Sequence, residues 1–304
     1  MTRSLAWFSS LLVGWLAVAA GPATAGLNVL ATVPEWASLA QEIGGGQVKV
    51  FAATHGLQDP HRIEARPSLI ARARSADLVV ATGADLEAGW LPVVLRESGN
   101  ARIQPGQPGY LEAAGLVRLL EVPARLDRAE GDVHPGGNPH IQTDPRNILK
   151  VGEALARRMA ELDPAGAAAY GAGWKSFAER WTAALARWDK DAAPLRGMPV
   201  LVQHKAFPYL EDWLGLRQLD ALEPKPGVEP TSGHLAAVAE RMKSRPARMV
   251  LRPAYQADGP SRWIAERTGI AVVTVPFTVG GTPEARDLFS LFDDTLRRML
   301  AVPR

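Results

Sequence analysis

The sequence of 304 residues contains no cysteine. No disulfide can hold the fold, so the packed core must stabilise it alone. A lipid attached to an N-terminal cysteine is not expected for the same reason. Any metal site must use histidine and carboxylate ligands instead of thiolates.

An excess of one charge is also missing. The chain has 34 basic and 32 acidic residues and a formal net charge of +2, with no block of lysine and arginine. Nucleic acid is therefore not expected as a partner. The 47% hydrophobic and 22% charged residues are typical of a globular protein, and the length predicts two lobes instead of one compact core.

Long apolar runs are absent except near the N-terminus. Residues 5–20 are largely apolar, Arg3 precedes them, and Ala23-Thr24-Ala25 follows them. This pattern predicts a signal peptide, residues 1–25, cleaved after Ala25. An uncleaved membrane anchor is the alternative, but the run is short for a membrane span. We therefore expect a periplasmic protein that is not lipidated.

The rest of the chain alternates short apolar strands with helices. We predict strands at residues 27–33, 48–54, 77–83, 199–203, 248–252 and 270–275. Such alternation indicates parallel strands with crossover helices. The sequence therefore predicts an α/β fold of two lobes, each with a mostly parallel sheet flanked by helices.

One predicted helix, from residue 165 to about residue 193, is much longer than the others. Its apolar and aromatic residues recur every three or four positions, so they form one stripe. A helix of this length spans about 40 Å and can run along both lobes. We predict an N-terminal lobe at 26–164, a rigid connecting helix at 165–195 and a C-terminal lobe at 196–304.

Three of the six histidines occupy positions suited to a binding site. His61 closes an Asp-Pro-His triplet after the second predicted strand, His140 closes an Asn-Pro-His triplet before a helix, and His204 follows the strand at 199–203. Open parallel sheets bind ligands beyond the carboxyl ends of their strands. Neutral imidazole is a common zinc ligand. We therefore predict that the three side chains converge on one transition-metal ion, with Zn²⁺ favoured. For a single histidine, a hydrogen-bonded structural role is the alternative.

The other three histidines have weaker signals. His55 and His134 each precede a predicted ligand by six residues, and either second-sphere or metal-delivery roles or purely structural ones fit them. His234 lies at a predicted helix start, which favours a surface or capping role.

These motifs resemble those of the periplasmic solute-binding proteins of zinc and manganese ABC importers, the cluster A-I metal-binding family. The similarity spans essentially the whole mature chain and includes residues 56–68, 76–83, 137–145, 204–209 and 264–269. The resemblance implies two α/β lobes joined by a rigid helix, with a metal between the lobes on His61, His140 and His204. It also implies delivery of the metal to an ABC permease in the inner membrane. A periplasmic metallochaperone is a second candidate partner, and a monomer is expected.

The chain departs from this family at the fourth metal ligand. Many members have a carboxylate where residues 276–281 contain none. Asp287 and Asp258 are the nearest candidates, and water or chloride can serve instead. Arg252 stands where many relatives have glutamate. Three carboxylates are candidates for hydrogen-bonding the ligand rings: Asp59, Glu64 and Asp144.

Other functions remain open. Three imidazoles and a water also form catalytic zinc sites, but the sequence has no His-Glu-x-x-His motif. A manganese or iron importer component is possible, although an all-imidazole site favours zinc over manganese. An adhesin-like or structural protein with incidental histidines is a further alternative. We expect a binding protein and no enzyme activity.

Overall fold

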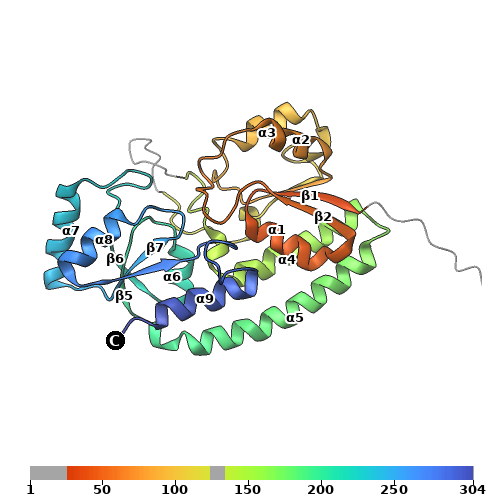
Figure 1. The fold of residues 1–304 in the computed structure, drawn as a ribbon. Coiled ribbons are helices and arrows are strands. Elements are labelled where there is room, and N and C mark those ends of the chain that lie inside the picture. Colours follow the sequence, from red (N-terminus) through yellow and green to blue (C-terminus); the bar gives the residue numbers. More distant parts are fainter. Residues whose placement is uncertain (1–25, 124–133, 304) are drawn as a thin grey trace, which may run out of the picture.

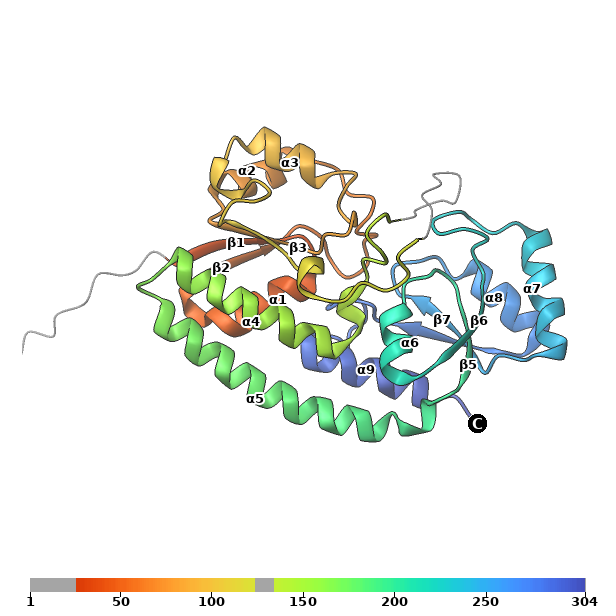
Figure 2. The same ribbon diagram turned by 180° about the vertical axis from the view of Figure 1, so that it is seen from behind.

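The computed structural model describes residues 26–123 and 134–303 (Figure 1). The predicted signal peptide at 1–25 lies outside the described residues. Two lobes lie side by side along one long helix, as both opposite views show (Figures 1 and 2). Within the described residues, no helix is long and apolar enough to cross a membrane.

The first lobe contains a parallel sheet of order β2-β1-β3-β4. Its strands are β1 (Leu27–Ala31), β2 (Val48–Ala52), β3 (Leu78–Ala81) and β4 (Tyr110–Glu112). Its helices are α1 (Pro34–Gly44), α2 (Pro67–Ser75) and α3 (Leu91–Ser98). Strand β3 is buried along its whole length, as expected for a central parallel strand.

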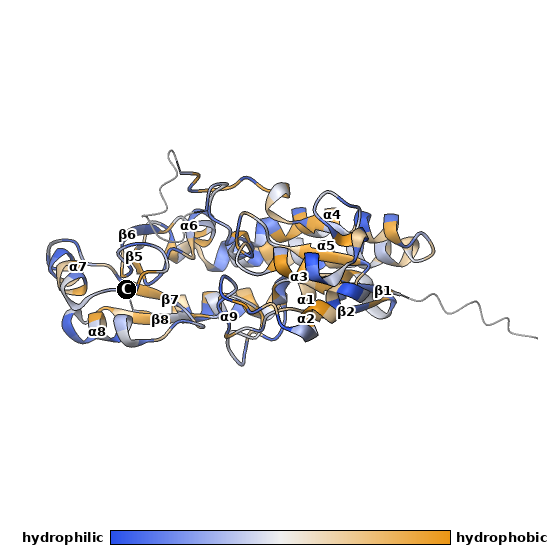
Figure 3. Cartoon of the chain, turned by 90° about the horizontal axis from the view of Figure 1, so that it is seen from above, coloured by the Kyte–Doolittle hydropathy of each residue, from blue (hydrophilic) through white to orange (hydrophobic). Residues whose placement is uncertain are grey.

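The second lobe repeats this arrangement, with a parallel sheet of order β6-β5-β7-β8. Its strands are β5 (Pro199–Val202), β6 (Arg217–Ala221), β7 (Met249–Pro253) and β8 (Ala271–Val275). Its helices are α6 (Pro208–Leu214), α7 (Ser232–Ser244) and α8 (Gly259–Thr268). Figure 3 shows strands β7 and β8 as hydrophobic and the outer loops near α7 and α8 as largely hydrophilic.

Three further helices connect and support the lobes: α4 (Pro145–Leu162), α5 (Ala167–Asp191) and α9 (Leu288–Leu300). Helix α5 is the long connecting helix, and α9 lies between it and the lobes (Figures 1 and 2). One continuous hydrophobic core includes residues of both sheets and of these helices. The predicted fold class of two parallel α/β lobes with a long helix is confirmed.

Several elements were not predicted from the sequence. Strands β4 and β6 lie at the sheet edges and carry polar residues, so they lack the apolar run that marks a buried strand. Helix α3 is short and was also missed. The last helix begins at Leu288, where the side chain of Asp287 caps it by accepting a hydrogen bond from the Ser290 amide at 2.7 Å.

The loops after β2 and β8 bring the two lobes into contact. Gly56 packs against the backbone of Gly280 so closely that a Cβ on Gly56 would lie 2.1 Å from the carbonyl carbon of Gly280. Nearby, the Thr278 hydroxyl donates a hydrogen bond to the buried carboxylate of Glu35 at the start of α1. Burial raises the pKa of Glu35 to about 7, and the charge of Glu87 adds to this effect.

Glu35→Gln is expected to stabilise the protein at high pH only. Because the pKa of Glu35 is about 7 in the folded protein and 4.5 ordinarily, the protein loses stability as the pH rises from about 4.5 to about 7, and the loss is complete above that range. Removing the charge should recover on the order of 2–3 kcal/mol at about pH 8 and little at about pH 4. Denaturant unfolding at the two pH values measures this.

The matched control is Glu240→Gln, which removes an exposed glutamate paired with Lys243 on α7. It should change the free energy of unfolding by less than about 0.5 kcal/mol at both pH values. An equal effect of Glu35→Gln at both pH values would contradict the assignment of a buried charge.

Candidate metal centre

The three predicted ligand histidines come together between the lobes. One ring nitrogen from each of His61, His140 and His204 lies within 4.8 Å of the others. The ring centroids are 5.3 Å apart for His61 and His140, 6.0 Å for His61 and His204, and 5.7 Å for His140 and His204. His61 comes from the loop after β2, His204 follows β5, and His140 directly precedes a short 3-10 turn before α4.

The two proline-containing triplets orient their histidines in the same way. The Asp59 carboxylate accepts hydrogen bonds from the backbone amide of His61 at 3.0 Å and from its Nδ1 at 2.7 Å. The Asn138 side-chain oxygen accepts from the backbone amide of His140 at 3.0 Å and from its Nδ1 at 2.8 Å. Since each Nδ1 is the donor, each Nε2 carries the lone pair.

His204 is oriented by a residue distant in sequence. Its Nδ1 donates to Glu223 Oε2 at 2.6 Å. The Glu223 carboxylate also accepts from the Gly227 amide at 2.8 Å and from the Gln256 side chain at 2.8 Å. Arg252 in turn donates hydrogen bonds to the Gln256 carbonyl and to the Thr274 hydroxyl, so this arginine supports the network around Glu223.

The free ring nitrogens have the character of metal ligands. His61 Nε2 and His140 Nε2 are buried and have no hydrogen-bond partner. Such orphaned polar atoms are costly in a folded protein unless a ligand uses them. Burial lowers the pKa of His140 well below 6.5, and the neighbouring histidines lower it further. The His140 ring is therefore neutral and able to coordinate at neutral pH.

Burial and neighbouring groups also shift the pKa of Asp59, the carboxylate that contacts His61. Burial alone would raise the pKa of Asp59, but its hydrogen bond with His61 and the nearby imidazoles outweigh this and lower the pKa. Asp59 therefore stays ionised and can accept the hydrogen bond from the protonated Nδ1 of His61.

An aromatic wall closes one side of the site. The Phe277 ring lies 5.4 Å from the His140 ring and 5.2 Å from Tyr255. Phe277 has a left-handed backbone with φ of 68°, an unfavourable conformation for a non-glycine residue that surrounding packing must hold.

No carboxylate in the described part of the chain joins the three histidines. Both candidates for a fourth ligand have other roles. Asp287 caps α9, and Asp258 pairs with Arg262 at 2.9 Å beside α8.

The remaining histidines differ in position. The His134 ring lies 5.4 Å from the His61 ring, so His134 borders the site. His55 is exposed and contacts its own turn, where the Leu57 amide lies 3.4 Å from its Nδ1. His234 lies in the first turn of α7, and the cap of that helix is Thr231, whose hydroxyl accepts from the His234 amide at 3.2 Å.

Only one of the three carboxylates predicted to hold the rings does so. Asp59 contacts His61, whereas Glu64 is exposed. Asp144 caps α4 and pairs with Arg146 at 2.7 Å. Glu223 was missed because no local pattern links it to His204; the pairing of β5 with β6 brings the two together.

Comparison with known proteins agrees with this geometry. The manganese ABC transporter substrate-binding lipoprotein ScaA of Streptococcus gordonii is 22% identical over 258 residues, which cover 83% of this chain and 80% of that protein. The zinc-binding lipoprotein AdcA of Streptococcus pneumoniae serotype 4 is 22% identical over 221 residues, covering 71% of this chain and 43% of that protein.

Solved structures share the fold. The crystal structure of ZnuA has a TM-score of 0.76 at 21% identity, covering 92% of this chain and 100% of that chain. The SBP FpvC from P. aeruginosa, solved in complex with Ni²⁺, has a TM-score of 0.74 at 21% identity, covering 92% and 98%.

The sequence model of the family described as "Zinc-uptake complex component A periplasmic" matches residues 29–302. This match confirms the resemblance inferred from the sequence motifs. The family consists of solute-binding transport proteins and not of enzymes. The chain therefore belongs to the zinc-uptake complex component A family, the metal-binding substrate-binding proteins of ABC transporters.

Proposed function

We propose that the protein captures Zn²⁺ through the Nε2 atoms of His61, His140 and His204 and delivers it to an ABC permease in the inner membrane. One observation carries this proposal: each ring holds its Nδ1 on an oxygen acceptor, and two of the Nε2 atoms are buried without a partner. Three preoriented imidazoles match the ligand preference of zinc. A water or chloride would be the fourth ligand and complete tetrahedral coordination of the zinc ion.

Several features belong to the same proposal. The chain would act in the periplasm as an unlipidated monomer after cleavage behind Ala25, although the related proteins ScaA and AdcA are named lipoproteins. A periplasmic metallochaperone would be a source of the metal. The lobes at 26–164 and 196–304 would each contribute ligands, joined by the helix at 165–195.

The choice of zinc over manganese is testable by competition. Relatives bear the names of both metals. Manganese prefers carboxylate-rich sites, and the described residues around these histidines provide no carboxylate ligand. We expect protein equilibrated with equimolar Zn²⁺ and Mn²⁺ to hold at least about a hundred times more zinc than manganese. Elemental analysis after dialysis measures the two metals.

The same experiment includes the unchanged protein stripped of metal as a blank. Manganese occupancy equal to or above zinc occupancy would overturn the zinc assignment. Failure to retain either metal would favour the structural or adhesin-like reading, in which the histidines are incidental.

Glu223→Gln is expected to weaken zinc binding by about 10–100-fold, the usual cost of losing an outer partner of a metal ligand. Glutamine keeps the size of the side chain but removes the charge that holds the Nδ1 proton of His204 at 2.6 Å. Titration against a zinc-chelating dye measures the change.

The matched control is Glu229→Gln, which removes an exposed carboxylate from the same connection after β6. Its zinc affinity should equal that of the unchanged protein. Equal affinities for Glu223→Gln and Glu229→Gln would show that Glu223 does not position His204.

A zinc hydrolase is less well supported by the site. A metal-bound water would need a general base within hydrogen-bond reach. The two carboxylates that contact the candidate ligand rings, Asp59 and Glu223, both accept Nδ1 protons from those rings. They are therefore occupied in orienting the histidines.

A further inference from the structure

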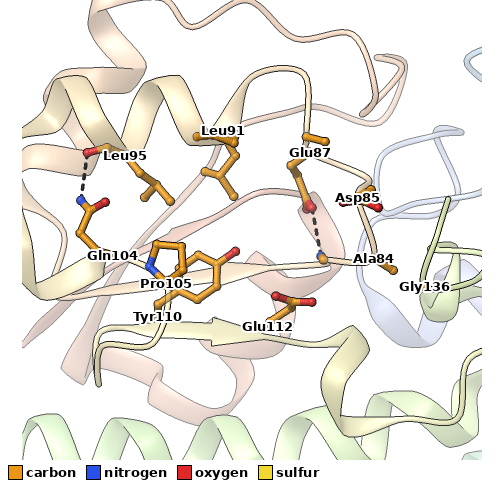
Figure 4. A pocket seen from close by; sticks show the side chains of 13 residues that line it. Ala84, Asp85, Glu87, Leu91, Leu95, Gln104, Pro105, Tyr110, Glu112 and Gly136 are labelled. Atoms are coloured by element: carbon orange, nitrogen blue, oxygen red, sulfur yellow. Dashed lines mark hydrogen bonds between the residues drawn. The ribbon is translucent and has the colours of Figure 1, made fainter.

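A second cavity lies in the N-terminal lobe, apart from the three histidines. It has a volume of about 380 Å³, and no histidine lines it. Figure 4 shows Leu91 and Leu95 of α3 on one side, with Tyr110 and Glu112 of β4 on the opposite side. The volume falls within the range of small-molecule pockets, near its lower end.

The turn after β3 forms a firm wall of this cavity. Gly83, Ala84 and Asp85 all have left-handed backbones, with φ of 80°, 48° and 64°. The buried carboxylate of Glu87 holds the turn by accepting the amide protons of Thr82 at 2.8 Å and Gly83 at 3.0 Å. Because these bonds constrain the turn, the cavity is already shaped before a ligand arrives.

The polar groups of the lining are mostly acceptors. Asp85 and Glu112 contribute exposed carboxylates, the Glu87 carboxylate is already hydrogen-bonded within the turn, and no lysine or arginine lines the cavity. The Gln104 side-chain nitrogen donates to the Leu95 carbonyl at 3.1 Å, which turns its oxygen toward the cavity (Figure 4). Such a lining attracts a ligand that donates hydrogen bonds and carries positive charge.

Tyr110 adds an aromatic face. Burial raises its pKa, and the charges of Glu87 and Glu112 raise it further, so the phenol stays neutral. A neutral ring can stack on a cation, while Leu91, Leu95 and Pro105 provide apolar surface for an uncharged part of the ligand.

A metal ion fits this cavity less well than an organic cation does. Among the described residues, only the three histidines bring enough ligand atoms close together to hold a metal; the carboxylates of the cavity do not. Spaced acceptors, an aromatic face and apolar walls suit an extended molecule. We propose that this cavity binds a small organic cation, a protonated amine attached to an apolar body.

The test compares three probes of similar shape: phenethylammonium, the neutral 2-phenylethanol and the anionic phenylacetate. Titration calorimetry with the metal-free mature protein is expected to give one site for the ammonium and at least about tenfold weaker binding of the alcohol, which is worth 1.4 kcal/mol. Phenylacetate should not bind. Binding of the alcohol or the acid as tight as the ammonium, or binding of none, would overturn the proposal.

Two variants locate the site. Glu112→Gln should weaken phenethylammonium binding about fivefold to tenfold. Ala88→Trp, at an exposed position of the lining, should block the cavity without disturbing the core. The control is Glu97→Gln, an exposed glutamate of α3 outside the lining, which should bind like the unchanged protein. Ammonium binding that survives both Glu112→Gln and Ala88→Trp would contradict this location.

The outcome is independent of the zinc assignment. His140→Ala should bind phenethylammonium as the unchanged protein does, because His140 does not line the cavity. Loss of amine binding in His140→Ala, with the protein folded, would contradict a separate site.

Discussion

Replacing His140 with alanine is expected to weaken zinc binding by more than about a hundredfold, beyond the usual cost of losing an outer partner. The substitution leaves two imidazoles and creates a space beside Phe277, whose ring lies 5.4 Å from His140. His61→Ala and His204→Ala should have effects of similar size. Competition against a chelating dye of known affinity measures all three.

Histidines outside the cluster provide matched controls. His234→Ala and His55→Ala remove imidazoles that lie away from the three ligands, so zinc affinity should not change. His134→Ala should have a smaller effect than His140→Ala, although its ring borders that of His61 at 5.4 Å. If His134→Ala were as damaging as His140→Ala, the proposed ligand set would be wrong.

Trp181→Ala is expected to destabilise the whole protein by about 3–5 kcal/mol. Trp181 lies on α5 with 0% exposure. Its ring packs 5.0 Å from Trp188, 4.9 Å from Phe289 and 5.5 Å from Phe292. Its indole nitrogen donates to the Pro145 carbonyl at 2.8 Å, so truncation leaves both a cavity and an unsatisfied acceptor.

Because the core is continuous between the sheets, this loss should affect both lobes in one unfolding transition. Denaturant unfolding followed by circular dichroism measures it, and Trp181→Phe provides a milder variant if the alanine protein does not fold. The comparison variant is Trp263→Ala, a half-buried tryptophan of α8 under Arg267, expected to cost about 1–2 kcal/mol and so less than Trp181→Ala. Equal costs for Trp181→Ala and Trp263→Ala would be inconsistent with a shared core along α5.

Local patterns in the sequence were enough to predict the fold class. Buried parallel strands such as β3 are continuous apolar runs, and the stripe of α5 recurs at helical spacing. The edge strands β4 and β6 were not predicted, because they are partly exposed and carry polar residues. The Asp-Pro-His and Asn-Pro-His triplets could also be recognised in the sequence. In each, the aspartate or asparagine accepts a hydrogen bond from the histidine two residues later.

Only the tertiary structure could decide which other groups serve the site. His55 and His134 both precede a predicted ligand by six residues, yet one contacts its own turn and the other borders His61. Glu223 reaches His204 because β6 pairs with β5, and Arg252 supports that contact through Gln256. The sequence by itself was enough to predict the fold class and the three candidate ligand histidines, because both predictions rest on short-range spacing. The outer partner of His204 and the cavity beside α3 depend on contacts between residues far apart in the chain, which no local spacing encodes.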